Sequence, residues 1–227
     1  MAKKVSRKQL LKEPDEFITF TGKMIRIVRT HQKKVLIALV AAVALFLIFS
    51  FVTFFTNRAE NNAFTLLTQA NDKYHALLAT QDAVAALREV EKDFEYILKK
   101  YSGYQGGKIA GIVYANYSFQ AGEYDRAAGL YLSALKHFEK DPTYRNLILS
   151  GLGYSYKARK DVETSTKYFE MIVASDIPLL KDEALFNLST LYGLSGNDNK
   201  RNDVLNAIIS DYPESIYIEL AKDRLSR

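Results

Sequence analysis

The spacing of hydrophobic positions changes near residue 57 of the chain. From Val35 to Thr56 the sequence reads VLIALVAAVALFLIFSFVTFFT, with no charge, proline or glycine, and 15 of these 22 residues are Val, Leu, Ile or Phe. As a helix this run would be about 33 Å long, enough to cross the ~30 Å hydrocarbon core of a bilayer. A helix buried in a soluble domain keeps a polar face, and this run has none. The pattern therefore predicts a transmembrane helix over residues 35–56.

Basic residues before this run predict its orientation. Residues 1–34 contain ten Lys and Arg against three acids, whereas only Arg58 lies close to the other end of the run. Because basic residues are retained on the cytoplasmic side, we expect a cytoplasmic N-terminus and export of residues 57–227. A cleaved signal peptide would have an apolar region of about 7–15 residues that ends in a small-residue cleavage site. The longer run, ending FFTNR, instead predicts an uncleaved signal-anchor.

Residues 1–34 are predicted to be a basic cytoplasmic arm that contains an amphipathic helix. Lys3 to Lys12 form the arm, and Pro14 suits the first position of a helix that has Asp15 and Glu16 in its first turn. Apolar residues then recur at steps of three and four, at Phe17, Phe20, Met24, Ile27 and Val28. This spacing favours a helix lying on the inner leaflet of the bilayer, and a docking helix for a protein partner is the alternative.

The distribution of charge argues against nucleic-acid binding. The chain has a formal charge of +5, but residues 1–34 alone carry +7, which leaves −2 for the rest. The positive charge is thus accounted for by membrane topology and anionic lipid headgroups. The absence of cysteine excludes disulfides, thiolate catalysis and the common zinc sites.

Residues 57–227 show helical spacing throughout and an internal repeat. Asp82 is the predicted N-cap of a helix that ends at Ser102 and Gly103. From residue 107 onward, segments 111–135, 147–173 and 184–213 each contain an apolar helix, a short polar turn and a second apolar helix. Small residues recur at equivalent places, at Ala115, Gly153 and Ser189, and glycines mark equivalent turns at Gly122 and Gly196.

This repeat resembles the tetratricopeptide repeat, a helix–turn–helix unit of about 34 residues. The first copy carries the closest match, at Ala115, Gly122, Tyr124, Ala127, Tyr131, Ala134 and Leu135. In the second copy Ser165 stands where Ala is usual, and in the third copy Arg201 stands there. The predicted fold is all-α: one transmembrane helix followed by a solenoid of hairpins at about 58–101, 107–140, 143–174 and 179–210, with a capping helix at 214–226.

A peptide-binding groove is the predicted functional site. If the repeats align, eight side chains from the first helices of the hairpins point into the concave face: Ile112, Asn116, Phe119, Tyr154, Lys157, Phe186, Thr190 and Leu194. An apolar groove with a few amides and hydroxyls suits extended or partly unfolded polypeptide.

Catalytic and cofactor sites are not predicted. His31, His75 and His137 lie on different segments, without metal-ligand spacing. The segment SGYQGGK at 102–108 departs from a phosphate loop because Ile109 replaces its Ser or Thr, so a turn between helices is expected. We therefore expect no enzyme activity, no cofactor, no metal and no small-molecule substrate.

A basic N-terminal arm, one uncleaved anchor and a small exported repeat domain together resemble the bacterial YfgM-like family of ancillary Sec translocon subunits. The resemblance implies a single-pass inner-membrane protein with its C-terminal domain in the periplasm. It also implies a chaperone-like adaptor that contacts translocon subunits, a membrane-anchored foldase and exported clients. The alternative is a structural scaffold in another envelope assembly, such as a secretion, pilus or outer-membrane biogenesis complex.

Overall fold

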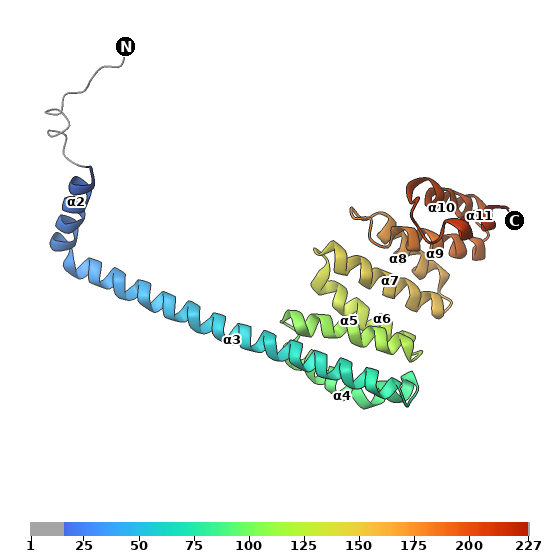
Figure 1. Cartoon of the computed structure of the whole chain (residues 1–227), viewed down its shortest axis with the longest axis horizontal. Coiled ribbons are helices and arrows are strands. Elements are labelled where there is room, and N and C mark those ends of the chain that lie inside the picture. Colours follow the sequence, from blue (N-terminus) through green and yellow to red (C-terminus); the bar gives the residue numbers. More distant parts are fainter. Residues whose placement is uncertain (1–15, 227) are drawn as a thin grey trace, which may run out of the picture. The chain divides into compact units, whose positions relative to one another are not determined.

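The computed structural model describes residues 16–226, and every regular element in that range is an α-helix (Figure 1). The predicted basic arm at Lys3 to Lys12, and Pro14 and Asp15, lie outside the described residues. The helices are α2 (Glu16–Thr30), α3 (Gln32–Leu78), α4 (Ala83–Tyr101), α5 (Gln105–Gln120), α6 (Tyr124–Phe138), α7 (Pro142–Ala158), α8 (Val162–Val173), α9 (Lys181–Leu194), α10 (Asp198–Asp211) and α11 (Ile218–Ser226). The chain divides into two units, Met1–Asn57 and Arg58–Arg227.

The first unit consists of α2 and the N-terminal part of α3. Large apolar side chains in both helices are exposed, for example Phe20 at 61% and Leu45 at 68%. Within residues 16–226, α3 is the one helix that is long and apolar enough to cross a membrane. Among the side chains described between residues 20 and 57, the apolar ones therefore form no packed core of their own.

The second unit begins inside α3, where the exposed apolar surface gives way to a buried stripe. Ala63, Leu67, Ala70 and Tyr74 recur at steps of three and four and are buried. They pack against α4 and α5 in a core that includes Val90, Phe94 and Tyr117, among other residues. The C-terminal part of α3 is thus the first helix of the first hairpin, with α4 as its partner.

Side-chain caps determine where several helices of the second unit begin. The Asp82 carboxylate accepts a hydrogen bond from the Ala85 backbone N–H at 2.8 Å, and α4 ends at Tyr101 before Ser102, so the predicted N-cap and end of this helix are confirmed. Asp141 caps α7 just before Pro142 at the first helical position, and Asp161 caps α8. Asn197 caps α10 by accepting from the Lys200 N–H. Such caps satisfy N–H groups that the first helical turn leaves without a partner.

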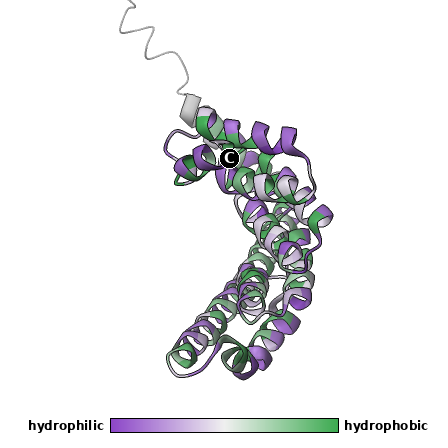
Figure 2. Ribbon diagram, turned by 90° about the vertical axis from the view of Figure 1, so that its right-hand side faces the viewer, coloured by the Kyte–Doolittle hydropathy of each residue, from purple (hydrophilic) through white to green (hydrophobic). Residues whose placement is uncertain are grey.

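The hairpins pair α5 with α6, α7 with α8, and α9 with α10, and α11 packs against α10. Two of the turns between paired helices contain a glycine with positive φ, Gly122 at 78° and Gly196 at 70°. At the equivalent turn of the middle hairpin, Lys160 has φ 61°, a conformation that is unfavourable for a residue with a side chain. Figure 2 shows the helices of this unit stacked along a curved path.

Close approach of paired helices requires small residues. A Cβ atom on Gly153 would lie 2.7 Å from the Phe169 ring, and the Ser165 hydroxyl donates to the Gly153 carbonyl at 2.8 Å. Ser165 is fully buried and occupies the position held in the first repeat by Ala127, which is also fully buried. At the third equivalent position stands Arg201, and a Cβ on Gly193 would lie 3.6 Å from its side chain, an ordinary van der Waals distance.

Candidate functional site

The first helices of consecutive hairpins are linked by a row of side-chain contacts, which we call the first-helix row. Its members lie on α5, α7, α9 and α11 and in the turn before α11. They are Phe119, Tyr154, Lys157, Phe186, Asn187, Ser189, Thr190, Tyr217 and Arg224. Within this row are five of the eight side chains that the sequence predicts for a groove, and all five are half-buried.

The middle of the row connects α5 to α7 through two aromatic rings and α7 to α9 through an amide. The rings of Phe119 and Tyr154 have centroids 6.5 Å apart. The Asn187 side-chain amide donates to the Tyr154 hydroxyl at 3.0 Å, and its oxygen accepts from the Lys157 ammonium at 2.8 Å. One buried amide thereby orients two of the predicted groove side chains. Phe119 also contacts the Tyr124 ring of α6, with centroids 5.3 Å apart, and packs against the core.

The C-terminal part of the row is completed by α11 and the residue before it. Phe186 stacks on Tyr217 with centroids 4.7 Å apart, and the Arg224 guanidinium lies 4.1 Å from the Phe186 centroid. Arg224 also donates to the Ser189 and Thr190 hydroxyls, each at 2.8 Å. The capping segment therefore contributes an arginine and a tyrosine to the same surface as α9.

Burial controls the ionisation of this surface. It raises the pKa of the Tyr154 hydroxyl to about 12, so this group remains a neutral hydrogen-bonding partner at physiological pH. Burial also lowers the pKa of Lys157, and the nearby positive charge of Arg224 lowers it further. The row thus combines aromatic rings, neutral amide and hydroxyl groups, and two neighbouring cations.

Three predicted groove residues are not part of the row. Ile112 is 9% exposed and packs in the core formed by α5 to α9, so its side chain supports the hairpins and presents little surface to a ligand. Leu194 is 69% exposed at the C-terminal end of α9. Asn116 is exposed, and its amide oxygen accepts a hydrogen bond from the Tyr131 hydroxyl of α6.

Sequence reasoning missed Asn187, Ser189, Tyr217 and Arg224 as members of this row. Asn187 is 4% exposed and stands between better-matched apolar positions, which gave no sign of a bridging role. Tyr217 and Arg224 belong to the segment predicted as a cap. In a repeat solenoid, a helix that stacks after the last hairpin takes the place of another first helix. Applied to the capping helix, this rule could have predicted that its side chains join the row.

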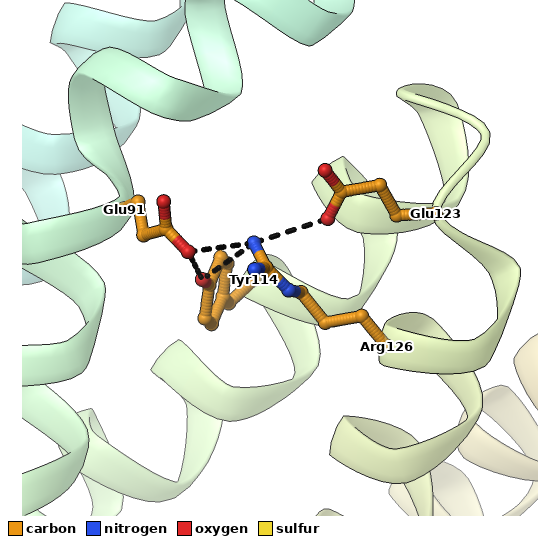
Figure 3. Close-up of polar contacts among 4 residues, drawn as sticks. All are labelled: Glu91, Tyr114, Glu123 and Arg126. Atoms are coloured by element: carbon orange, nitrogen blue, oxygen red, sulfur yellow. Dashed lines mark hydrogen bonds and ion pairs between the residues drawn. The ribbon is translucent and has the colours of Figure 1, made fainter.

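A second polar cluster joins α4, α5 and α6 (Figure 3). The Arg126 guanidinium lies 2.8 Å from the Glu91 carboxylate and 3.0 Å from the Glu123 carboxylate, and it donates to the Tyr114 hydroxyl at 3.3 Å. Burial raises the pKa of Tyr114 to about 12. Both carboxylates are paired with one arginine across three helices, an arrangement that links the first two hairpins and suits a structural role.

The glycine-rich turn before α5 is filled by a carboxylate of the protein itself. Glu60 accepts hydrogen bonds from the backbone N–H groups of Gln105 at 3.0 Å and Gly106 at 2.7 Å. These are N–H groups at the start of a helix, where an anion is favoured. Glu60 occupies the position that a phosphate would need, so the segment serves as the expected turn between helices.

A large cleft lies elsewhere in the second unit. It has a volume of about 700 Å³ and is lined by residues of α8, the end of α9 and the turn that follows, including Lys167, Tyr168 and Tyr192. The Tyr192 hydroxyl donates to Glu170 at 2.6 Å. Within residues 16–226, no group of three or more His, Cys, Asp or Glu side chains is placed to hold a metal ion.

Comparisons with known proteins identify the fold of this chain. A tetratricopeptide repeat protein from Parabacteroides merdae superimposes with a TM-score of 0.56 at 15% identity, over 70% of this chain. The chain spans 58% of the length of that protein. A putative kinesin light chain from Podosopora anserina with nearly identical TPR-like repeats gives a TM-score of 0.51 at 12% identity, over 67% of this chain and 75% of that one. A single-residue variant of the same Podosopora protein gives a TM-score of 0.52.

No family model and no curated protein matches the sequence. The structural similarities define the class of fold: the chain contains a tetratricopeptide-like helical-repeat unit, and the predicted all-α repeat architecture is confirmed.

Proposed function

We propose that the chain is a single-pass membrane protein whose repeat unit binds other proteins through the first-helix row. The observation that carries the proposal is the row itself. Side chains from α5, α7, α9 and α11 contact one another and leave aromatic, hydroxyl and cationic groups partly exposed. Rings and short polar groups along a repeat surface suit extended polypeptide.

The apolar part of α3 supports membrane anchoring. Its large side chains are exposed on every side, with Leu36 at 60%, Val40 at 60% and Phe49 at 69%. In water this surface would be strongly unfavourable, whereas in lipid each such residue favours insertion by roughly 0.3–0.6 kcal/mol. The excess of Lys and Arg before this segment supports a cytoplasmic N-terminus and an exported repeat unit.

The proposed location is the bacterial inner membrane, with the repeat unit in the periplasm. The layout of arm, anchor and repeats resembles the YfgM-like family, and this resemblance is the support for partners at the Sec translocon. The proposed partners are translocon subunits, a membrane-anchored foldase and exported clients. The proposal assigns no catalytic step, no cofactor and no nucleic acid to the chain.

A scaffold subunit of another envelope assembly is the second candidate, and one observation favours it. Lys157 and Tyr154 are already bonded to Asn187, and Arg224 is already bonded to Ser189 and Thr190. A surface held in one arrangement by its own hydrogen bonds recognises one partner of fixed shape more readily than many unfolded segments.

Photo-crosslinking in intact membranes tests the proposal and separates the two candidates. A benzophenone amino acid at Phe119 probes the first-helix row, and the same probe at exposed Lys140 is the matched control. We expect translocon subunits and several exported proteins to be captured from position 119 and absent from position 140. Capture of one dominant envelope protein would support the scaffold. Identical products at both positions, or none at position 119, would contradict binding through the first-helix row.

A further inference from the structure

The helix α2 exposes an apolar face among the described residues of the first unit. Phe20, Met24, Ile27 and Val28 are 61%, 49%, 53% and 45% exposed. With about 100° between successive helical residues, these four side chains fall within an arc of about 100°. Their exposure is similar to that of side chains in the apolar part of α3, such as Val43 at 51%.

Basic side chains border this arc and occupy the opposite side of α2. Lys23 lies at one edge of the arc, and Arg26 and Arg29 lie on the far side together with Gly22. Two further lysines, Lys33 and Lys34, follow at the start of α3. A basic helix with an apolar face matches the surface of an anionic bilayer, where long basic side chains reach the headgroups while the apolar face enters the acyl boundary.

The chain keeps α2 close to the membrane that α3 would cross. One residue, His31, separates α2 from α3, and the backbone hydrogen bonds continue across it, from His31 N–H to Ile27 and from Val35 N–H to His31, each at 2.9 Å. Val28 precedes the apolar run by seven residues, a distance of about 10 Å along a helix. If α3 crosses a membrane, α2 therefore lies next to the membrane surface at the point where α3 enters it.

We propose that α2 is an interfacial helix: its apolar face inserts into the leaflet that α3 enters, and its basic side chains bind anionic lipid headgroups. The inference rests on the proposed membrane anchoring of α3. It adds a lipid-binding site on the cytoplasmic side, separate from the protein-binding surface of the repeat unit. Charge complementarity and continuity with the span select lipid as the occupant over a protein partner.

Single cysteines introduced into the full chain provide the test, since the protein has none of its own. Met24→Cys places a spin label on the apolar arc, and Gly22→Cys places one on the opposite side, where nothing lies within 4 Å of a Cβ. Neither change alters the charge. The labelled protein is reconstituted into vesicles of phosphatidylcholine with or without phosphatidylglycerol, and flotation confirms incorporation. Collisions of each label with oxygen, which partitions into lipid, and with a water-soluble nickel chelate are then measured.

We expect the ratio of oxygen to nickel accessibility to be severalfold higher at position 24 than at position 22, and to rise with phosphatidylglycerol. Replacing Lys23, Arg26 and Arg29 by Gln should release α2, shifting its equilibrium by about fivefold for each charge removed. Ile27→Gln should also lower the ratio at position 24, whereas Ile25→Gln, outside the arc, should lower it less.

Equal ratios at positions 24 and 22 in floating vesicles would overturn the inference and leave the face of α2 for a protein partner. If the ratio of oxygen to nickel accessibility at position 24 changes neither with the anionic lipid nor with the triple substitution, headgroup binding would be overturned. Failure of the protein to float with the vesicles would instead contradict the anchoring by α3, so the two proposals fail in different ways.

Discussion

The two parts of α3 use apolar residues in opposite ways. Between residues 35 and 56 the apolar side chains surround the helix, and the large ones face outward, for example Phe46 at 67%. Between residues 58 and 78 fewer residues are apolar, yet Ala63 and Tyr74 are fully buried. A narrow stripe of apolar positions with a polar remainder builds a packed core, whereas a uniform apolar surface requires an apolar solvent. Changes in the two parts should therefore have separable effects.

The largest effect is expected from charges in the apolar part. Leu45→Arg combined with Phe46→Arg should raise the free energy of membrane insertion by about 7 kcal/mol and move the protein to the soluble fraction after alkaline extraction. The control pair is Leu132→Arg with Leu147→Arg, at two exposed leucines of the repeat unit, which should leave the protein in the membrane. Membrane retention of the first variant would contradict a span over residues 35–56.

The next largest effect should come from a close backbone contact in the repeat unit. A Cβ on Gly107 would lie 1.9 Å from the Tyr101 carbonyl oxygen, so Gly107→Ala forces the turn between α4 and α5 to move and should destabilise this unit by about 3 kcal/mol. Near-UV circular dichroism reports this unit through its tyrosines, because all 15 follow residue 57 and the chain has no Trp.

Gly22→Ala in α2 is the matched control for this substitution, since a Cβ there meets nothing within 4 Å. It should leave the tyrosine transition unchanged. Equal effects of the two alanines would mean that the turn before α5 is not the close contact described.

Two leucines of α3 give a direct test of the contrast between its parts. Leu67 is 8% exposed and packs in the core of the first hairpin, so Leu67→Ala should lower the free energy of unfolding of the repeat unit by about 2.5 kcal/mol. Leu45 is 68% exposed, and Leu45→Ala should leave the unfolding midpoint within error of the parent chain. Denaturation in detergent, followed by the tyrosine signal, measures both. Similar unfolding midpoints for the two variants would contradict the claim that only the C-terminal part of α3 belongs to a packed core.

The smallest effect concerns the turn between α7 and α8. Lys160 has a positive φ where the equivalent turns have Gly122 and Gly196, so Lys160→Gly should stabilise the repeat unit by about 1 kcal/mol. The opposite change, Gly122→Ala, should destabilise it by a similar amount, and the same tyrosine transition measures both. A destabilising Lys160→Gly substitution would show that flexibility of the unfolded chain outweighs the relief of strain at this turn.

The hairpins could be predicted from sequence because their signals are local. Apolar spacing, the Asp82 cap and the glycine turns each depend on residues within a few positions of one another. Glu60 contacts the start of α5 at Gln105 and Gly106, which follow it in the sequence by 45 and 46 positions. This contact depends on how two hairpins stack. No local pattern contains that information.

The candidate site was less accessible to sequence reasoning for the same reason. The alignment placed Tyr154 and Lys157 on one face of α7, but the side chain that joins them is Asn187 of the next hairpin. It also placed Ile112 in a groove, whereas packing within the core of α5 to α9 buries that residue. Which face of a repeat helix remains at the surface is decided by neighbouring helices, and their residues can lie some thirty positions away in the sequence, as Asn187 does.

The topology of the chain is the central claim, and thiol labelling measures it directly. Single cysteines at Lys33, before the apolar run, and at Lys140, in the repeat unit, are exposed to a membrane-impermeant maleimide in spheroplasts. The account predicts labelling of position 140 in intact spheroplasts and of position 33 only after lysis. Labelling of position 33 before lysis, or protection of position 140 until lysis, would contradict it.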